Sequence, residues 1–261
     1  MWTKTHLITL FPSLLIYLII AIGLRFWLIN KDKKIKMIPV HIITILLIGL
    51  EITKQIKSII NGYKLNDLPL YYCSLFLYIY LALSLYKGKH RDSITIQAVV
   101  AGLTLLGVMV IMPSIVYSEG AIKNMFRDFD DFHTVAYHNI VLLGTFIIIS
   151  LKLFNFNFKN DLLITIVFYI SYCVIAAPIA ILLKENFNQF DHNTVTAIEN
   201  IRLSLIEKLG YSWGQSIYAL LDTLTTVGFS TIMFILFFLL SKLCSKSFKK
   251  NQNNNNSNIT T

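Results

Sequence analysis

A cysteine stands one turn into an apolar run that begins with a proline. Residues 68–75 read Leu-Pro-Leu-Tyr-Tyr-Cys-Ser-Leu, so Cys73 lies between Tyr72 and Ser74. A cysteine is an effective nucleophile as the thiolate, and a nearby imidazole can take its proton. His138, in a later apolar run, supplies such an imidazole. The sequence predicts Cys73 and His138 as a catalytic pair that carries an acyl group as a cysteine thioester.

Further polar side chains interrupt the apolar runs. Ionisable residues inside a membrane are costly and mark either function or a buried pair. Glu51 and Lys54, three residues apart, can pair on one helical face. Tyr72, Ser74 or Lys54 would donate hydrogen bonds to an oxyanion. The predicted substrate-binding or pocket residues are Glu51, Lys54, Tyr72, Ser74, Thr134, Gln215, Tyr218 and Asp222.

Two histidines compete for the role of base. His133 and His138 are five residues apart, about 140° around a helix, so both cannot point at one small target. His138 lies deeper in its apolar run, and Thr134 shares its face at a spacing of four. We therefore expect His138 to be the partner of Cys73.

Simpler interpretations remain open for each residue. A free cysteine in an apolar helix is usually a small packing residue. His138 alone would be a hydrogen-bonded core residue, and Glu51 with Lys54 a structural ion pair. Asp222 would bond one helix to another. Cys173 and Cys244 are best interpreted as packing residues.

Metal and cofactor sites are not indicated. The three cysteines show no CxxC spacing and are odd in number, which argues against a zinc ribbon or a disulfide framework. The six histidines include no HxxxH pair, and a catalytic zinc site needs three well-placed ligands. The last apolar run has no lysine before Lys242, which excludes a retinal protein. We predict no metal and no cofactor.

Composition defines the class of protein that must position these residues. Of 261 residues, 55% are hydrophobic and 14% charged, and the mean hydropathy is +0.63. Several continuous apolar runs exceed the roughly 20 residues that cross a bilayer as a helix. We predict an all-α polytopic membrane bundle with seven spans, at roughly 7–29, 37–60, 70–86, 94–113, 134–153, 161–183 and 213–241.

Basic residues in the short loops predict the orientation. They are denser on the side of the loops after the first, third, fifth and seventh spans, which should face the cytoplasm. The N-terminus is then outside, the C-terminus inside, and Cys73 about one turn below the outer surface of the plasma membrane. The net charge of +9 suits anionic headgroups better than nucleic acid. The predicted partners are membrane phospholipids; the sequence does not define the oligomeric state.

Three further features lie at the ends of the spans or between them. Pro113 is expected to end the fourth span. Between Lys184 and Ser212, apolar residues recur at three- and four-residue spacing, which predicts an amphipathic helix lying either in the interface or on the bundle. Residues 1–250 form the predicted seven-helix domain, and the Asn-rich residues 251–261 a disordered cytoplasmic tail.

These motifs carry a family resemblance. Glu51-x-x-Lys54, the Leu68–Ser74 stretch and the aromatic segment from Phe132 to His138 resemble the bacterial YwaF-type integral membrane proteins. That family is related to a eukaryotic transmembrane acyltransferase family acting on ether phospholipids. The resemblance implies seven spans and a membrane-embedded thiol site, with Cys73 as nucleophile and His138 as its partner. It also implies acyl transfer between a phospholipid and a lysophospholipid.

Together these observations predict a lipid acyltransferase (transacylase) or lipid hydrolase with a Cys–His pair in an outer-leaflet pocket. The alternative is a non-enzymatic transporter or a small-molecule- or lipid-binding membrane protein that uses the same polar pocket. A purely structural membrane protein is a third interpretation, favoured if all the polar groups pair with one another.

Overall fold

The computed structural model describes residues 2–116 and 118–257, with side chains described as far as Leu243. The helical elements in this part of the chain are α1 (Lys4–Leu28), α2 (Lys33–Lys36), α3 (Ile38–Ile60), η1 (Leu65–Asp67), η2 (Tyr72–Ser74), α4 (Leu75–Leu85), α5 (Arg91–Ile111), α6 (Pro113–Val116), α7 (Glu119–Asn124), α8 (Phe129–Leu151), α9 (Phe158–Leu183), η3 (Phe187–Gln189), α10 (Thr196–Leu209) and α11 (Tyr211–Ser257).

Seven helical segments are long and apolar enough to cross a membrane, as predicted. They are Lys4–Leu28, Lys33–Ile60, Leu65–Leu85, Arg91–Ile111, Phe129–Leu151, Phe158–Leu183 and Tyr211–Leu243. The all-α, multi-pass architecture is thereby confirmed. Which end of the bundle faces outward stays a prediction. The predicted tail falls on 251–261 and Cys244 on the last helix, and both lie beyond the described side chains.

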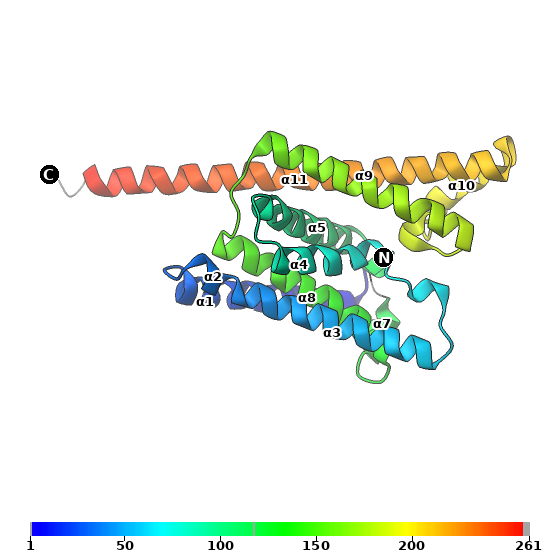
Figure 1. The fold of residues 1–261 in the computed structure, drawn as a ribbon, viewed down its shortest axis with the longest axis horizontal. Coiled ribbons are helices and arrows are strands. Elements are labelled where there is room, and N and C mark those ends of the chain that lie inside the picture. The colour runs from blue at the N-terminus through cyan, green and yellow to red at the C-terminus, as the bar shows by residue number, and fades with distance from the viewer. Residues whose placement is uncertain (1, 117, 258–261) are drawn as a thin grey trace.

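α5 and α8 form the centre of the bundle. α8 packs against α1, α3 and α5, whereas α5 also packs against α4, α9 and α11. Figure 1 shows α1 and α3 on one side of the bundle and α9 and α11 on the other, with α4 and α5 between them. Many of the fully buried apolar side chains lie on α5 and α8, while α1 keeps most of its apolar surface for lipid. Neighbouring helices are therefore held mainly by close packing.

Local sequence signals explain where several helices begin and end. Asp128 caps α8, because its carboxylate accepts hydrogen bonds from the Asp130 and Asp131 N–H groups. Asn157 caps α9 in the same way through the Asn160 N–H. α5 ends at Ile111, two residues before Pro113, as predicted.

The amphipathic segment forms α10, as its spacing predicted, and α10 packs against α11. Gly210 connects the two helices at φ 75°, a left-handed conformation that favours glycine. A Cβ at Gly214 would lie 2.6 Å from the Ile206 Cα, so only glycine permits this approach of the two helices. α10 thus packs on the last span, while whether it also lies in the membrane interface stays a prediction.

Candidate functional site

The third membrane span is broken where Cys73 lies. The sequence placed Pro69 at the first position of its helix, but α4 begins at Leu75. Leu68 has the extended conformation (φ −56°, ψ 133°) to which a following proline restricts the backbone. Tyr71 is also extended, and Cys73 sits in the 3₁₀ turn η2 immediately before α4. The expected position one turn inside an α-helix is therefore wrong.

The broken segment is held in place from α9. The Tyr172 hydroxyl donates a hydrogen bond to the Leu70 carbonyl at 2.9 Å. Tyr72 stacks on Tyr169 at a ring-centroid distance of 5.9 Å, and their hydroxyls are 3.2 Å apart. Because the Tyr72 hydroxyl faces α9, it is not the free oxyanion donor that the sequence suggested.

Cys73 is half-buried beside charged and backbone polar groups. Its sulfur lies next to the backbone N–H groups of Cys73 and Ser74, and Lys54 and Glu51 are the charged residues acting on it. Ser74 is buried at the start of α4. The sulfur thus lies at the start of α4, near backbone N–H groups, one lysine and one glutamate.

Glu51 and Lys54 take different partners from those predicted. The Glu51 carboxylate accepts a hydrogen bond from Gln55 Nε2 at 2.7 Å and lies 3.6 Å from His133 Nε2. Lys54 Nζ pairs instead with Asp67 Oδ1 at 4.0 Å. The expected Glu51–Lys54 pair is wrong, because η1 folds Asp67 over the end of α3. Gln55 fixes this arrangement by also donating to the Asp67 carbonyl at 2.8 Å.

The register of the helices decides which histidine lies level with Cys73. On α4 and α8, the Tyr80 hydroxyl is 3.5 Å from the Val141 carbonyl, and the Tyr137 hydroxyl lies near the Leu77 N–H. The two helices therefore run parallel with an offset of about 60 residues, and one further turn brings Cys73 level with His133. Glu51 stands at the same level, through its contact with His133.

His138 lies about one turn deeper than this level. It is buried, and its Nδ1 is 2.6 Å from the Thr134 carbonyl. A carbonyl only accepts, so Nδ1 carries the hydrogen and the lone pair of the neutral ring is on Nε2. The Thr134 side chain does not meet His138, because its hydroxyl donates to the Asp130 carbonyl at 2.9 Å.

Comparison with known proteins gives one match. The model of the TMEM164 family matches residues 1–241, nearly the whole chain. The chain belongs to the TMEM164 family. No curated protein and no solved structure matches it. The finer resemblance to YwaF-type proteins stays a prediction.

In this TMEM164-family protein, the predicted residues of the last span form a separate group. Gln215 Nε2 donates to the Phe190 carbonyl at 2.7 Å, and its Oε1 accepts from Arg202 Nη1 at 2.9 Å. The Tyr218 hydroxyl donates to the Gln189 carbonyl at 2.8 Å. Asp222 faces Asn188 Nδ2 at 3.5 Å. These side chains hold the connection between α9 and α10.

That connection needs such support because of its backbone. Lys184, Asn188 and Gln189 all have left-handed backbone conformations, with φ of 55°, 49° and 65°. Residues other than glycine adopt this region at a cost of roughly 1 kcal/mol or more. The hydrogen bonds from Gln215 and Tyr218 offset this cost, which gives both residues a structural role.

Several residues of the site were not predicted from the sequence of this protein. Asp67 and Gln55 both contact the Glu51–Lys54 face, and Gln55 lies four residues after Glu51, a spacing that signals contact. Tyr137 is buried beside His133, with ring centroids 5.4 Å apart. A tyrosine in an aromatic-rich apolar run carries no sequence signal that separates it from packing residues.

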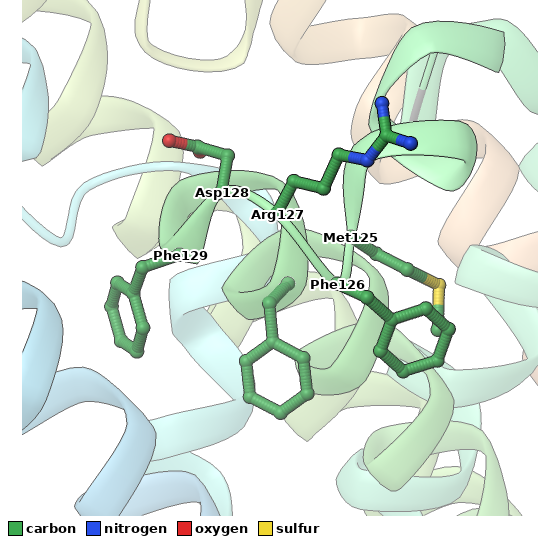
Figure 2. A pocket seen from close by; sticks show the side chains of 6 residues that line it. Met125, Phe126, Arg127, Asp128 and Phe129 are labelled. Carbon is green, nitrogen blue, oxygen red and sulfur yellow. The ribbon is translucent and has the colours of Figure 1, made fainter.

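The protein surface carries two clefts. One, of about 460 Å³, is lined by Lys184, Asp191, Arg202 and Tyr211. The other, of about 320 Å³, lies at the start of α8 and is lined by Met125, Phe126, Arg127, Asp128, Phe129 and Phe132. Figure 2 shows that the Arg127 guanidinium extends to one side of the backbone, whereas the Phe126 and Phe129 rings extend to the opposite side.

The second cleft borders the His133 level of the site. The Phe129 ring is 6.3 Å from the His133 ring, and Lys57 Nζ lies 5.5 Å from the Phe129 centroid. Lys57 also pairs with Asp130 at 2.8 Å, which continues the contact between α3 and α8. Among the described residues, no group of three or more His, Cys, Asp and Glu side chains is arranged to hold a metal.

Proposed function

We propose that this protein is a plasma-membrane lipid acyltransferase in which Cys73 is the nucleophile. The observation that carries the proposal is the break before α4, which places the Cys73 sulfur beside backbone N–H groups and within reach of the fields of Glu51 and Lys54. Membership of the TMEM164 family and the resemblance to ether-phospholipid acyltransferases support it. Membrane phospholipids are the proposed substrates.

The proposed reaction has two halves. The Cys73 thiolate attacks the ester carbonyl of a phospholipid, the carbon–oxygen ester bond breaks, and a lysophospholipid leaves with a proton. The hydroxyl of an acceptor lysophospholipid then attacks the thioester and gives its proton to the general base, the carbon–sulfur bond breaks, and the sulfur leaves as the thiolate. The Cys73 N–H is the proposed donor for the oxyanion of each tetrahedral intermediate, since the Ser74 N–H donates to the Tyr71 carbonyl at 2.9 Å.

The register favours His133 as the group that exchanges protons with Cys73. Glu51, 3.6 Å from His133 Nε2, is placed to stabilise the imidazolium that forms. His138, the base predicted from the sequence, remains the competing assignment because its Nε2 carries the lone pair in the neutral ring. Lys54, held by Asp67, supplies positive charge close to the thiolate.

The proposal is tested by measuring acyl transfer from a labelled phospholipid to a lysophospholipid with the purified protein in lipid nanodiscs. Cys73→Ser should lower the rate at least about 100-fold, because the hydroxyl is a far weaker nucleophile than the thiolate. Cys173→Ser is the matched control, since Cys173 is fully buried in the packed α9 interface and should leave the rate within about twofold. Equal activity of the wild type and Cys73→Ser would exclude Cys73 as nucleophile.

A transporter or small-molecule-binding protein is the alternative that one observation favours. The cleft of about 460 Å³ beside Lys184, Asp191 and Arg202 has a size typical of ligand sites and lies apart from Cys73. Under this alternative, a ligand would protect Lys184 from chemical labelling without any acyl transfer. Turnover that depends on Cys73 would contradict it.

A further inference from the structure

The cleft at the start of α8 separates apolar from charged side chains. Its six lining residues enclose about 320 Å³. In Figure 2 the Phe126 and Phe129 rings lie on one side of the backbone, whereas the Arg127 guanidinium and the Asp128 carboxylate lie on the other. The cleft therefore offers an apolar wall and a charged rim to one ligand.

The apolar wall of the cleft is open to the surroundings. Phe126 is 86% exposed and Phe132 38%. The apolar segment of α8 begins at Phe129, so residues 125–128 lie immediately outside the membrane span. In a bilayer this depth is the polar headgroup layer. Exposed apolar side chains at this depth mark a contact with lipid rather than with water.

The charged rim carries one residue of each sign. Arg127 is exposed, and none of the ion pairs formed by the described residues includes it. The Asp128 carboxylate accepts the Asp130 and Asp131 N–H groups, both on Oδ1, which leaves Oδ2 for a further partner. A guanidinium matches the oxygens of a phosphate, and a carboxylate pairs with an ammonium group. A ligand with both groups satisfies the rim, whereas a purely anionic ligand would face Asp128.

Lys57 borders the cleft from α3 without changing this balance. Its Nζ lies 5.5 Å from the centroid of the Phe129 ring and 2.8 Å from Asp130 Oδ2. An ammonium group is attracted to the face of an aromatic ring. Because Lys57 and Asp130 neutralise each other, the rim keeps one positive and one negative charge.

The cleft is continuous with the level of Cys73. The Phe129 ring is 6.3 Å from the His133 ring, and the two residues are one helical turn, about 6 Å, apart along α8. The polar layer on each side of a bilayer is roughly 5–8 Å thick, and the ester groups of a phospholipid lie at its inner edge. A phospholipid with its headgroup in the cleft would thus have its ester groups level with His133 and Cys73.

We propose that this cleft binds the headgroup of a zwitterionic phospholipid from the surrounding bilayer. Arg127 holds the phosphate, Asp128 holds the ammonium group, and Phe126 packs against the first carbons of the acyl chains. Binding itself requires no turnover. That the bound lipid is the acyl donor rests on the proposed function.

Photo-crosslinking in nanodiscs tests the binding. The probe is phosphatidylcholine with a diazirine near the carboxyl end of one acyl chain, and the readout is the crosslinking of Phe126 relative to Phe11, which is 56% exposed on α1 and reports ordinary lipid contact. Arg127→Gln should lower this ratio several-fold. Lys123→Gln is the matched control, because Lys123 is exposed one turn earlier and pairs with Glu119. An unchanged ratio for Arg127→Gln would overturn the proposal.

Competition identifies the occupant of the cleft. Unlabelled phosphatidylcholine should compete with the probe several-fold better than phosphatidylglycerol, which is anionic, or diacylglycerol, which has no phosphate. Asp128→Asn should remove the discrimination against phosphatidylglycerol, and asparagine keeps the helix cap. Equal competition by diacylglycerol would show that the rings alone contact lipid and would overturn the proposal. Stronger competition by lysophosphatidylcholine would overturn the assignment to the donor.

Kinetics test whether the bound lipid is the acyl donor. Arg127→Gln should raise the KM for phosphatidylcholine several-fold and leave kcat within about twofold, because the headgroup contact is the same in the ground state and the transition state. An unchanged KM would overturn the donor role. The two proposals fail separately: Cys73→Ser without effect on acyl transfer concerns the nucleophile, whereas a wild-type crosslinking ratio in Arg127→Gln concerns the cleft.

Discussion

The groups around Arg202 and around Cys73 both collect polar side chains at the end of the bundle where the third span is broken. In the first, Arg202 donates to both Glu199 oxygens and to Gln215, and Gln215 in turn bonds the Phe190 carbonyl. In the second, His133 Nε2 and the Tyr137 hydroxyl are buried without full hydrogen bonds. Saturated groups hold a fold together, whereas unsatisfied ones remain available to a substrate.

The difference follows from which backbone each group supports. The Arg202 group holds a connection with left-handed residues, which needs its hydrogen bonds to persist. The Cys73 group lies where a proline breaks a span, and the tyrosines of α9 hold that break from the other side. Because α9 already holds the break, the Cys73 side chain is not needed to stabilise it.

The largest expected effect concerns the Cys73 group. His133→Gln should lower acyl transfer about 100- to 10,000-fold, the usual range for loss of a general base, while Tm changes little. His138→Gln is the matched variant and should have the smaller effect, because His138 lies one turn deeper. Steady-state rates and thermal unfolding of both variants measure this. The opposite order of activities would return the role of base to His138.

For the Arg202 group we expect the reverse pattern. Arg202→Met should lower the free energy of unfolding by about 2 kcal/mol, because Glu199 and Gln215 lose their donor in a partly buried site. Lys123→Met is the control, since the Lys123–Glu119 pair is exposed and screened by solvent and should contribute little to stability. Thermal unfolding gives the stability, and acyl transfer per folded molecule should be preserved. A loss of activity without a loss of stability would show that the Arg202 group also contributes to the reaction.

Packing of α10 on α11 gives an effect of about 1–3 kcal/mol. Gly214→Ala forces a methyl group against the Ile206 backbone and should destabilise the protein by that amount. Gly228→Ala, where no atom lies within 4 Å of the new Cβ, should be neutral or stabilise α11 by up to about 1 kcal/mol. Equal Tm values for the two variants would show that α10 moves freely on α11.

The smallest effect is a pH dependence of the Arg202 group. Hydrogen bonds from Arg202 hold the pKa of Glu199 below its ordinary value of 4.5. A lowered folded-state pKa adds stability above the unfolded pKa, and this is lost as the pH falls through the folded value. Below about pH 4.5, hydrogen exchange in the connection before α10 should therefore accelerate in the wild type. Glu199→Gln should abolish that acid-dependent increase; an unchanged increase would point to another group.

Several features were predictable because they depend on local sequence. Continuous apolar runs determine the spans, Pro113 the end of α5, and the three- and four-residue spacing the helix α10. The candidate nucleophile was also visible, since it follows the distinctive Leu-Pro-Leu-Tyr-Tyr stretch. The start of α4 was misplaced, because a proline suits both the first turn of a helix and an extended segment, and sequence alone does not separate the two.

Tertiary structure decided how the polar residues pair. Helical spacing showed that Glu51 and Lys54 share a face. In the structure, however, Lys54 pairs with Asp67 and Glu51 with His133, which come from other segments. The residues predicted to line one pocket likewise divide into the Arg202 and Cys73 groups. The sequence by itself determined the seven spans, because continuous apolar length is a local property of the chain. Which polar residues meet depends on the register and rotation of neighbouring helices, which only packing sets.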